Sequence, residues 1–211
     1  MLFACDFNDL INSEGQRCEW RRSFACPCVN PASGAAQKTC EFCWGFGHLW
    51  EDPVDAIVAK TGSDVVKRWT SFGQYDEGDT VMSIGSDSPA YAIGAFDRVL
   101  MLDQTEPFSF NVIPDVNNRI RFPVISVEKV LQIDVAGVTP VLVQRGLPDV
   151  DQLGKITWPA GEPVGTYSLT GRRNVEFFAW TSQPFDRPHE HGEPLPRRIV
   201  MKRFDLYGRQ G

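Results

Sequence analysis

Residues 26–47 read CPCVNPASGAAQKTCEFCWGFG, and this stretch decides how the N-terminal part of the chain folds. Four cysteines stand there as two close pairs, separated by proline, asparagine, serine and glycine residues that favour turns. No periodic pattern of apolar residues runs through the stretch, so a hydrophobic core does not organise it. The pattern therefore predicts a segment that folds around a metal ion.

The two cysteine pairs predict a structural zinc site. Thiolates at these spacings supply the four ligands of tetrahedral zinc, and the metal then replaces a core. Four sulfur ligands leave no open coordination position for a water molecule, which a catalytic zinc requires. Gly45 and Gly47 can adopt the backbone dihedrals of a zinc knuckle without a Cβ penalty. The predicted ligands are Cys26, Cys28, Cys40 and Cys43.

Other interpretations of the cysteines stay open from the sequence. The four could form two disulfides, although a direct bridge between Cys26 and Cys28 would be strained and a reducing compartment disfavours pairing. His48 lies just beyond the second pair and could replace one sulfur. Cys5 and Cys18 match no ligand pattern, so we expect buried or idle thiols, with a bridge between them or to a neighbouring subunit as the alternative.

Composition and charge exclude several classes of protein. The 211 residues carry a formal net charge of −6, which gives no global positive field to attract nucleic acid. No apolar run approaches the roughly 20 residues of a membrane helix. Asp6 and Asp9 interrupt the apolar start of the chain, which argues against a secretory signal and for folding in a reducing cytoplasm.

Beyond residue 53 the chain shows short β-rich runs separated by turn formers. At the N-terminus, ahead of the cysteines, residues 1–25 fit a short helix or an arm. The expected strands of a first β unit are Val54–Ala59, Val65–Ser71, Thr80–Ile84, Tyr91–Ile93 and Arg98–Leu102. Those of a second β unit are Arg119–Val124, Val127–Ile133, Val141–Gln144, Lys155–Trp158, Thr166–Thr170, Val175–Trp180 and Arg198–Tyr207.

The sequence thus predicts a mainly β protein, with small antiparallel barrel or sandwich units preceded by the four-cysteine zinc knuckle. The expected domains are residues 1–50 for the N-terminal arm and knuckle, 51–113 for the first β unit and 114–211 for the second. Within the second unit, four prolines between residues 183 and 196 predict an exposed arm.

No catalytic motif is visible, so we expect a protein that is not an enzyme. The chain has no nucleophile elbow, phosphate-binding loop, His-Glu-x-x-His or dinucleotide fingerprint. His189 and His191 could bind a second metal, but their proline-rich setting favours a solvated loop. The acidic run Gly73–Asp79 lacks the ligand spacing of a calcium loop and predicts a tight turn. Basic and apolar residues alternate from Arg197 to Phe204, which indicates a strand with one solvated face.

Cys26-Pro-Cys28 followed by Cys40-x-x-Cys43-x-Gly45-x-Gly47 resembles the N-terminal knuckle of small structural proteins encoded among tailed-bacteriophage head and tail genes. The resemblance continues in Gly78-Asp79-Thr80, in Phe96-Asp-Arg-Val-Leu100, in Arg172-Arg-Asn-Val-Glu-Phe-Phe178 and in Leu195-Pro-Arg-Arg198. It spans most of the chain and is strongest at residues 26–47 and 172–207. The chain is similar to head-to-tail connectors of the head-closure or adaptor kind.

This resemblance implies a virion protein, made in the host cytoplasm, that forms a homo-oligomeric ring in the neck. Such a ring lies between portal or adaptor proteins and tail proteins and lets DNA pass without sequence-specific binding. A net negative charge suits this role, because a channel that attracted phosphates would retain the DNA. We expect association through the N-terminus and the proline-rich arm.

Three other functions stay open from the sequence. They are a tail-completion or baseplate protein, a zinc-ribbon nucleic-acid-binding protein supported by Arg17, Arg21 and Arg22, and an unrecognised zinc-stabilised enzyme.

Overall fold

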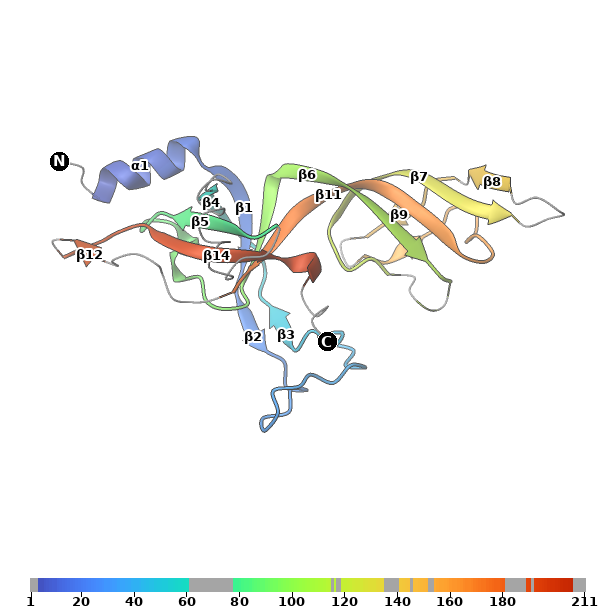
Figure 1. Ribbon diagram of the computed structural model, residues 1–211, viewed down its shortest axis with the longest axis horizontal. Coiled ribbons are helices and arrows are strands. Elements are labelled where there is room, and N and C mark those ends of the chain that lie inside the picture. The colour runs from blue at the N-terminus through green and yellow to red at the C-terminus, as the bar shows by residue number, and fades with distance from the viewer. Residues whose placement is uncertain are drawn as a thin grey trace. The chain divides into compact units, whose positions relative to one another are not determined.

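The computed structural model describes residues 4–60, 78–114, 116, 119–134, 141–144, 146–151, 154–180, 189–190 and 192–206 (Figure 1). The chain forms two compact units. Unit 1 comprises Met1–Asp103 and Glu176–Gly211, and unit 2 comprises Gln104–Val175.

The helical elements are α1 (Ala4–Glu14), the 3-10 turn η1 (Pro89–Ala92) and the 3-10 turn η2 (Phe204–Leu206). The strands are β1 (Gln16–Arg21), β2 (Ser23–Ala25), β3 (His48–Trp50), β4 (Val54–Lys60), β5 (Thr80–Ile84), β6 (Arg98–Val112), β7 (Val124–Asp134), β8 (Val141–Gln144), β9 (Asp149–Val150), β10 (Ile156–Thr157), β11 (Tyr167–Ala179), β12 (His189–Glu190), β13 (Glu193–Pro194) and β14 (Arg197–Arg203).

Unit 1 is a closed antiparallel β-barrel of six strands. The strand order is β14-β5-β4-β1-β6-β11, and a further pairing of β14 with β11 closes the barrel. Cys18 on β1 is paired with Ala56 on β4 and with Met101 on β6, so these three side chains share one face. The mainly β prediction is confirmed.

The barrel interior is filled by apolar side chains, as expected for a barrel of few strands. They come from all six strands because alternate residues of each strand point inward. The interior residues that are at most 1% exposed are Cys18, Val58, Met82, Ile84, Val99, Met101, Phe177, Ile199, Met201 and Ala179.

The N-terminal part of unit 1 contains α1, which confirms a helix where a helix or an arm was expected. Gly15 joins α1 to β1, and a Cβ there would overlap the backbone oxygen of Ile11. After β1, the chain leaves the barrel through β2, returns through β3 and re-enters it at β4 (Figure 1). Residues 26–47, which we call the cysteine segment, are therefore inserted between the barrel strands β1 and β4 and do not precede the whole barrel.

Unit 2 contains the continuations of β6 and β11, together with β7 to β10. β7 is paired with β11 and with β8. The core of the unit consists of Phe108, Val112, Ile120, Val130, Tyr167 and Leu169. Gly171 sits at a register shift of β11, where a Cβ would overlap the backbone oxygen of Ser126.

Several predicted strands are confirmed, with Thr80–Ile84 and Val141–Gln144 matching β5 and β8 residue for residue. Tyr91–Ile93 was wrong, because Tyr91 belongs to the 3-10 turn η1 and Ile93 caps it; at the other end, the N-cap Ser88 accepts a hydrogen bond from the Ala90 amide. Arg119–Val124 was also wrong as a strand, since residues 120–123 form no strand, Arg119 makes an isolated bridge and Val124 begins β7.

Two further differences concern the second half of the chain. The expected strands Thr166–Thr170 and Val175–Trp180 are one strand, β11. In the expected arm, the described residues include a short ladder between β12 and β13. Val65–Ser71 lies outside the described residues.

The two compact units divide the chain differently from the expected boundaries at residues 50 and 113. β14 is paired with β5, so residues near the C-terminus belong to the same barrel as residues 80–84. Unit 2 is therefore an insertion into unit 1, which returns to the barrel at Glu176.

Candidate metal centre

The β2–β3 ladder brings the two cysteine pairs together. Ala25 is paired with His48, so Cys26 directly follows the ladder on one side and Gly47 directly precedes it on the other. The amide of Cys26 donates a hydrogen bond to the oxygen of Gly47 at 2.9 Å. This short hairpin base places Cys26 and Cys28 opposite Cys40 and Cys43.

The sulfur atoms have the spacing of a tetrahedral metal site. The four Sγ atoms lie within 4.8 Å of one another, with 3.8 Å between Cys26 and Cys40 and 3.4 Å between Cys28 and Cys43. Four sulfurs at about 2.3 Å from a central zinc would be about 3.8 Å apart. All six cysteines are free thiols, and the sulfur spacing is well above the roughly 2.05 Å of a disulfide. The four cysteines could hold a metal ion such as zinc.

The backbone around the cluster has the conformation that the two glycines predicted. Gly45 and Gly47 have φ values of 82° and 78°, in the left-handed region that favours glycine. The amide of Gly47 donates a hydrogen bond to the Cys43 sulfur at 3.3 Å. Cys26, Cys40 and Cys43 are buried. The turn thus aims an amide at a sulfur, which stabilises a thiolate there.

The thiols of the cluster have unequal acidity. The backbone amide of Cys43 donates to the Cys40 sulfur and, with the amide of Phe42, outweighs burial, so the pKa of Cys40 falls to about 7. The amide of Gln37 acts in the same sense on Cys28, but burial and the neighbouring thiols raise the pKa of Cys28 to about 12. A metal ion that binds all four sulfurs must therefore displace protons, and its affinity must rise with pH.

No other candidate ligand joins the cluster. Among the described residues, the four cysteines form the one group of three or more potential ligands. His48 stacks on the ring of Phe96 with centroids 4.4 Å apart. Cys5 is exposed on α1, and the sulfur of Cys18 donates to the oxygen of Ala56 inside the barrel. His189 is exposed on β12.

Two further sequence candidates have limited structural descriptions. His191 lies outside the described residues. Of the acidic run Gly73–Asp79, the described part is Gly78 and Asp79, and Asp79 is buried 3.6 Å from the Lys202 ammonium.

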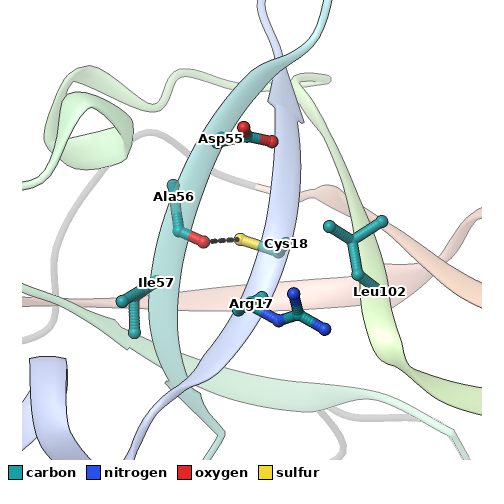
Figure 2. Close-up of a pocket in the computed structure, with 6 residues that line it drawn as sticks. All are labelled: Arg17, Cys18, Asp55, Ala56, Ile57 and Leu102. Atoms are coloured by element: carbon teal, nitrogen blue, oxygen red, sulfur yellow. Dashed lines mark hydrogen bonds between the residues drawn. The ribbon is translucent and has the colours of Figure 1, made fainter.

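A shallow depression of about 380 Å³ lies on the wall of the barrel between β1, β4 and β6 (Figure 2). Arg17, Cys18, Asp55, Ala56, Ile57 and Leu102 line it. Arg17 makes an ion pair with Asp103 at 2.7 Å, so its charge is already neutralised. Burial raises the pKa of Cys18 to about 12, which keeps the thiol protonated and a poor nucleophile.

Two of the three arginines that precede the cysteines lie beside carboxylates. Besides the Arg17–Asp103 pair, Arg21 lies 3.2 Å from Glu19, whereas Arg22 and Lys38 are exposed. The two paired arginines offer less positive charge to a phosphate backbone.

Sequence reasoning missed a buried group beside the cysteine segment. Arg98 donates to Glu176 at 2.7 Å, and its guanidinium lies over the rings of Trp50 and Phe204 at 4.6 and 3.9 Å. In β6, Arg98 points away from the side of the interior residues Val99 and Met101, and no local sequence signal identifies Glu176 as its partner.

Comparison of the chain with protein-family models and with curated proteins found no match. Among the described residues, no helix is both long and apolar enough to cross a membrane.

Proposed function

We propose that this chain is a structural protein of a tailed bacteriophage, built into the neck ring that joins the portal to the tail, with zinc bound at Cys26, Cys28, Cys40 and Cys43. The observation that supports the proposal most strongly is the cysteine segment. Its spacing resembles the knuckle of head-to-tail connectors, and its four sulfurs lie within 4.8 Å of one another.

Zinc is the metal that best suits this donor set. Four thiolates in a tetrahedral arrangement favour zinc over magnesium or calcium, which prefer oxygen ligands. Because all four positions would be taken by protein sulfurs, the ion would stabilise the fold of residues 26–47 and would not activate water. Its role is structural.

Unit 2, the smaller unit, carries six of the twelve large apolar side chains that are exposed among the described residues. They are Ile113, Val116, Ile125, Leu142, Leu147 and Val164. In the proposed ring, any of them that form a contiguous patch would be covered by a neighbouring subunit. The neighbours would be further copies of the chain, portal or adaptor proteins and tail proteins of the virion, around a channel through which DNA passes.

Native mass spectrometry of the full chain, with and without a chelator, tests the zinc site. We expect one zinc per chain, lost in Cys40→Ser and retained in the matched control Cys5→Ser, because Cys5 is exposed and distant in sequence from the cluster. A metal-free chain that is lighter by four hydrogens would contradict the zinc site and indicate two disulfides.

Electron microscopy of the same metal-loaded sample tests the ring. We expect closed rings with a central opening at micromolar concentration. A chain that binds zinc but stays monomeric over the whole concentration range would contradict a self-assembling ring and leave the metal site standing.

A further inference from the structure

Phe46 of the cysteine segment packs against the barrel where β14 ends in η2. Its ring centroid lies 6.0 Å from that of Trp50 and 5.5 Å from that of Phe204. Trp50 and Phe204 also meet edge to face at 5.5 Å, and Phe178 lies 6.4 Å from Phe204. We call these four rings, Phe46, Trp50, Phe178 and Phe204, the aromatic cap.

The aromatic cap covers the outer face of the barrel where it closes. All five residues from Val175 to Ala179 are buried, although alternate residues of a barrel strand point outward. Phe177 and Ala179 are paired with residues of β14 on the interior side, so Glu176 and Phe178 point outward. These two outward side chains are buried because Phe178 packs against Phe204 and Glu176 is paired with Arg98.

The backbone position of Phe46 is set by the cysteines on both sides. Its amide donates to the oxygen of Cys43 at 2.9 Å. The next residue, Gly47, donates to the Cys43 sulfur and accepts from the Cys26 amide. Phe46 is thus held between two of the four proposed metal ligands.

Apolar burial within the described part of the segment is small. The buried cluster there consists of Cys26, Cys40 and Cys43, with Cys28, Val29 and Leu49 packed against it. A cluster this small does not stabilise a loop of 22 residues by apolar burial. A bound metal would supply the missing constraint, as it does in small domains that lack a core.

We infer that metal binding at the four cysteines stabilises the closing seam of the barrel, formed by β11, β14 and η2, and that Phe46 transmits this effect. The inference rests on the proposed zinc site but not on the proposed place in a virion. With metal bound, Phe46 is fixed against Trp50 and Phe204, and η2 is held on the barrel. Without metal, the segment loosens, Phe46 leaves the aromatic cap, and the seam opens more often.

Hydrogen–deuterium exchange of the full chain, with and without chelator, tests this inference. The metal content of each sample is measured first by mass spectrometry, so loss of the metal site and loss of coupling are separate results. In the wild type we expect chelation to speed exchange in residues 197–206 about tenfold, in addition to exchange in residues 26–47. Faster exchange follows because the open state of the seam becomes more populated.

Phe46→Ala and Phe42→Ala form a matched pair of variants. Both remove a phenylalanine from the same segment, but Phe42 is 78% exposed and Phe46 belongs to the aromatic cap. We expect Phe46→Ala to bind metal, to exchange rapidly at residues 197–206 and to show no further change on chelation. Phe42→Ala should behave as the wild type does. Phe46→Leu, which keeps an apolar side chain, should give intermediate protection and serves if the alanine variant does not fold.

Two results would overturn the inference. One is a wild-type chain that loses its metal while residues 197–206 keep their protection. The other is a Phe46→Ala chain in which chelation still speeds exchange at these residues as much as in the wild type, because the coupling would then run through another contact.

Discussion

Replacing Arg98 by methionine is expected to lower the free energy of unfolding by about 3–5 kcal/mol. The side chains of Arg98 and Glu176 are only 15% and 6% exposed, so the ion pair is largely removed from water. Without the guanidinium, the Glu176 carboxylate remains buried with no positive partner at this contact. Its Oε2 already has no hydrogen-bond partner in the wild type, so that oxygen offers no compensating bond. The lost contacts with the Trp50 and Phe204 rings contribute about 0.5–2 kcal/mol of this total.

A double-mutant cycle measures the coupling within the pair. Chemical denaturation is followed by circular dichroism for Arg98→Met, Glu176→Gln and the double variant. We expect the double variant to recover at least about 2 kcal/mol of the summed single losses, because removing both charges leaves no buried charge unpaired. Arg17→Met is the matched control, since the Arg17–Asp103 pair is exposed and its loss should change stability little. A loss of unfolding free energy below about 1 kcal/mol for Arg98→Met would contradict a buried ion pair. Single-variant losses that simply add in the double variant would contradict coupling between the two side chains.

Three further predictions follow from individual residues. Cys18 should resist maleimide in the folded chain, because its buried thiol has a pKa of about 12; rapid labelling would contradict its place inside the barrel. Burial lowers the pKa of His48 from 6.5, so the folded chain binds this proton less readily than the unfolded chain, and stability should fall as pH drops below about 6.5. His48→Gln should reduce the difference between the urea unfolding midpoints measured at pH 7.5 and 5.5. An unchanged difference would mean that other groups cause the pH dependence. Gly154→Ala should destabilise the chain by more than about 1 kcal/mol, because the new Cβ would overlap the backbone oxygen of Ile120; Gly161→Ala, with a similar positive φ but open space, should cost less in the same thermal melts.

The candidate site could be predicted from the sequence because its determinants are local. Two cysteine pairs and two glycines within 22 residues specify both the cluster of four sulfurs and the turn that aims an amide at a sulfur. β5 and β8 were predicted accurately for a similar reason: short β-branched runs lie between clear turn formers.

Other elements were missed because the local signal points to a different structure. The polar stretch Gly171–Asn174 resembles a turn, yet β11 passes through it with register shifts, and Arg173 is held by Glu106 at 2.6 Å. Tyr91 has an aromatic side chain that favours strands, but Ser88 and the following proline start a 3-10 turn there. In the first case tertiary contacts outweigh turn propensity, and in the second capping outweighs strand propensity.

The closure of the barrel could not be predicted, because a periodic pattern identifies a strand and one buried face but not the partner strand. β14 is paired with β5 and with β11, so Arg197 lies opposite Ile84 and Met201 opposite Ala179. These partners are far apart in the sequence. The same long-range arrangement brings Glu176 to Arg98, which explains why that buried pair left no sequence signal.

The insertion of the cysteine segment between β1 and β4 bears on how the barrel tolerates metal loss. Residues 22–53 connect these two paired strands, so a metal that fastens residues 26–43 shortens the effective loop. Loop-closure entropy grows only slowly, however, with each doubling of length costing about 0.6 kcal/mol. The β1–β4 ladder and the buried interior should therefore survive chelation. The larger consequence of metal loss should fall on the aromatic cap, where a single ring, Phe46, depends directly on the position of Cys43.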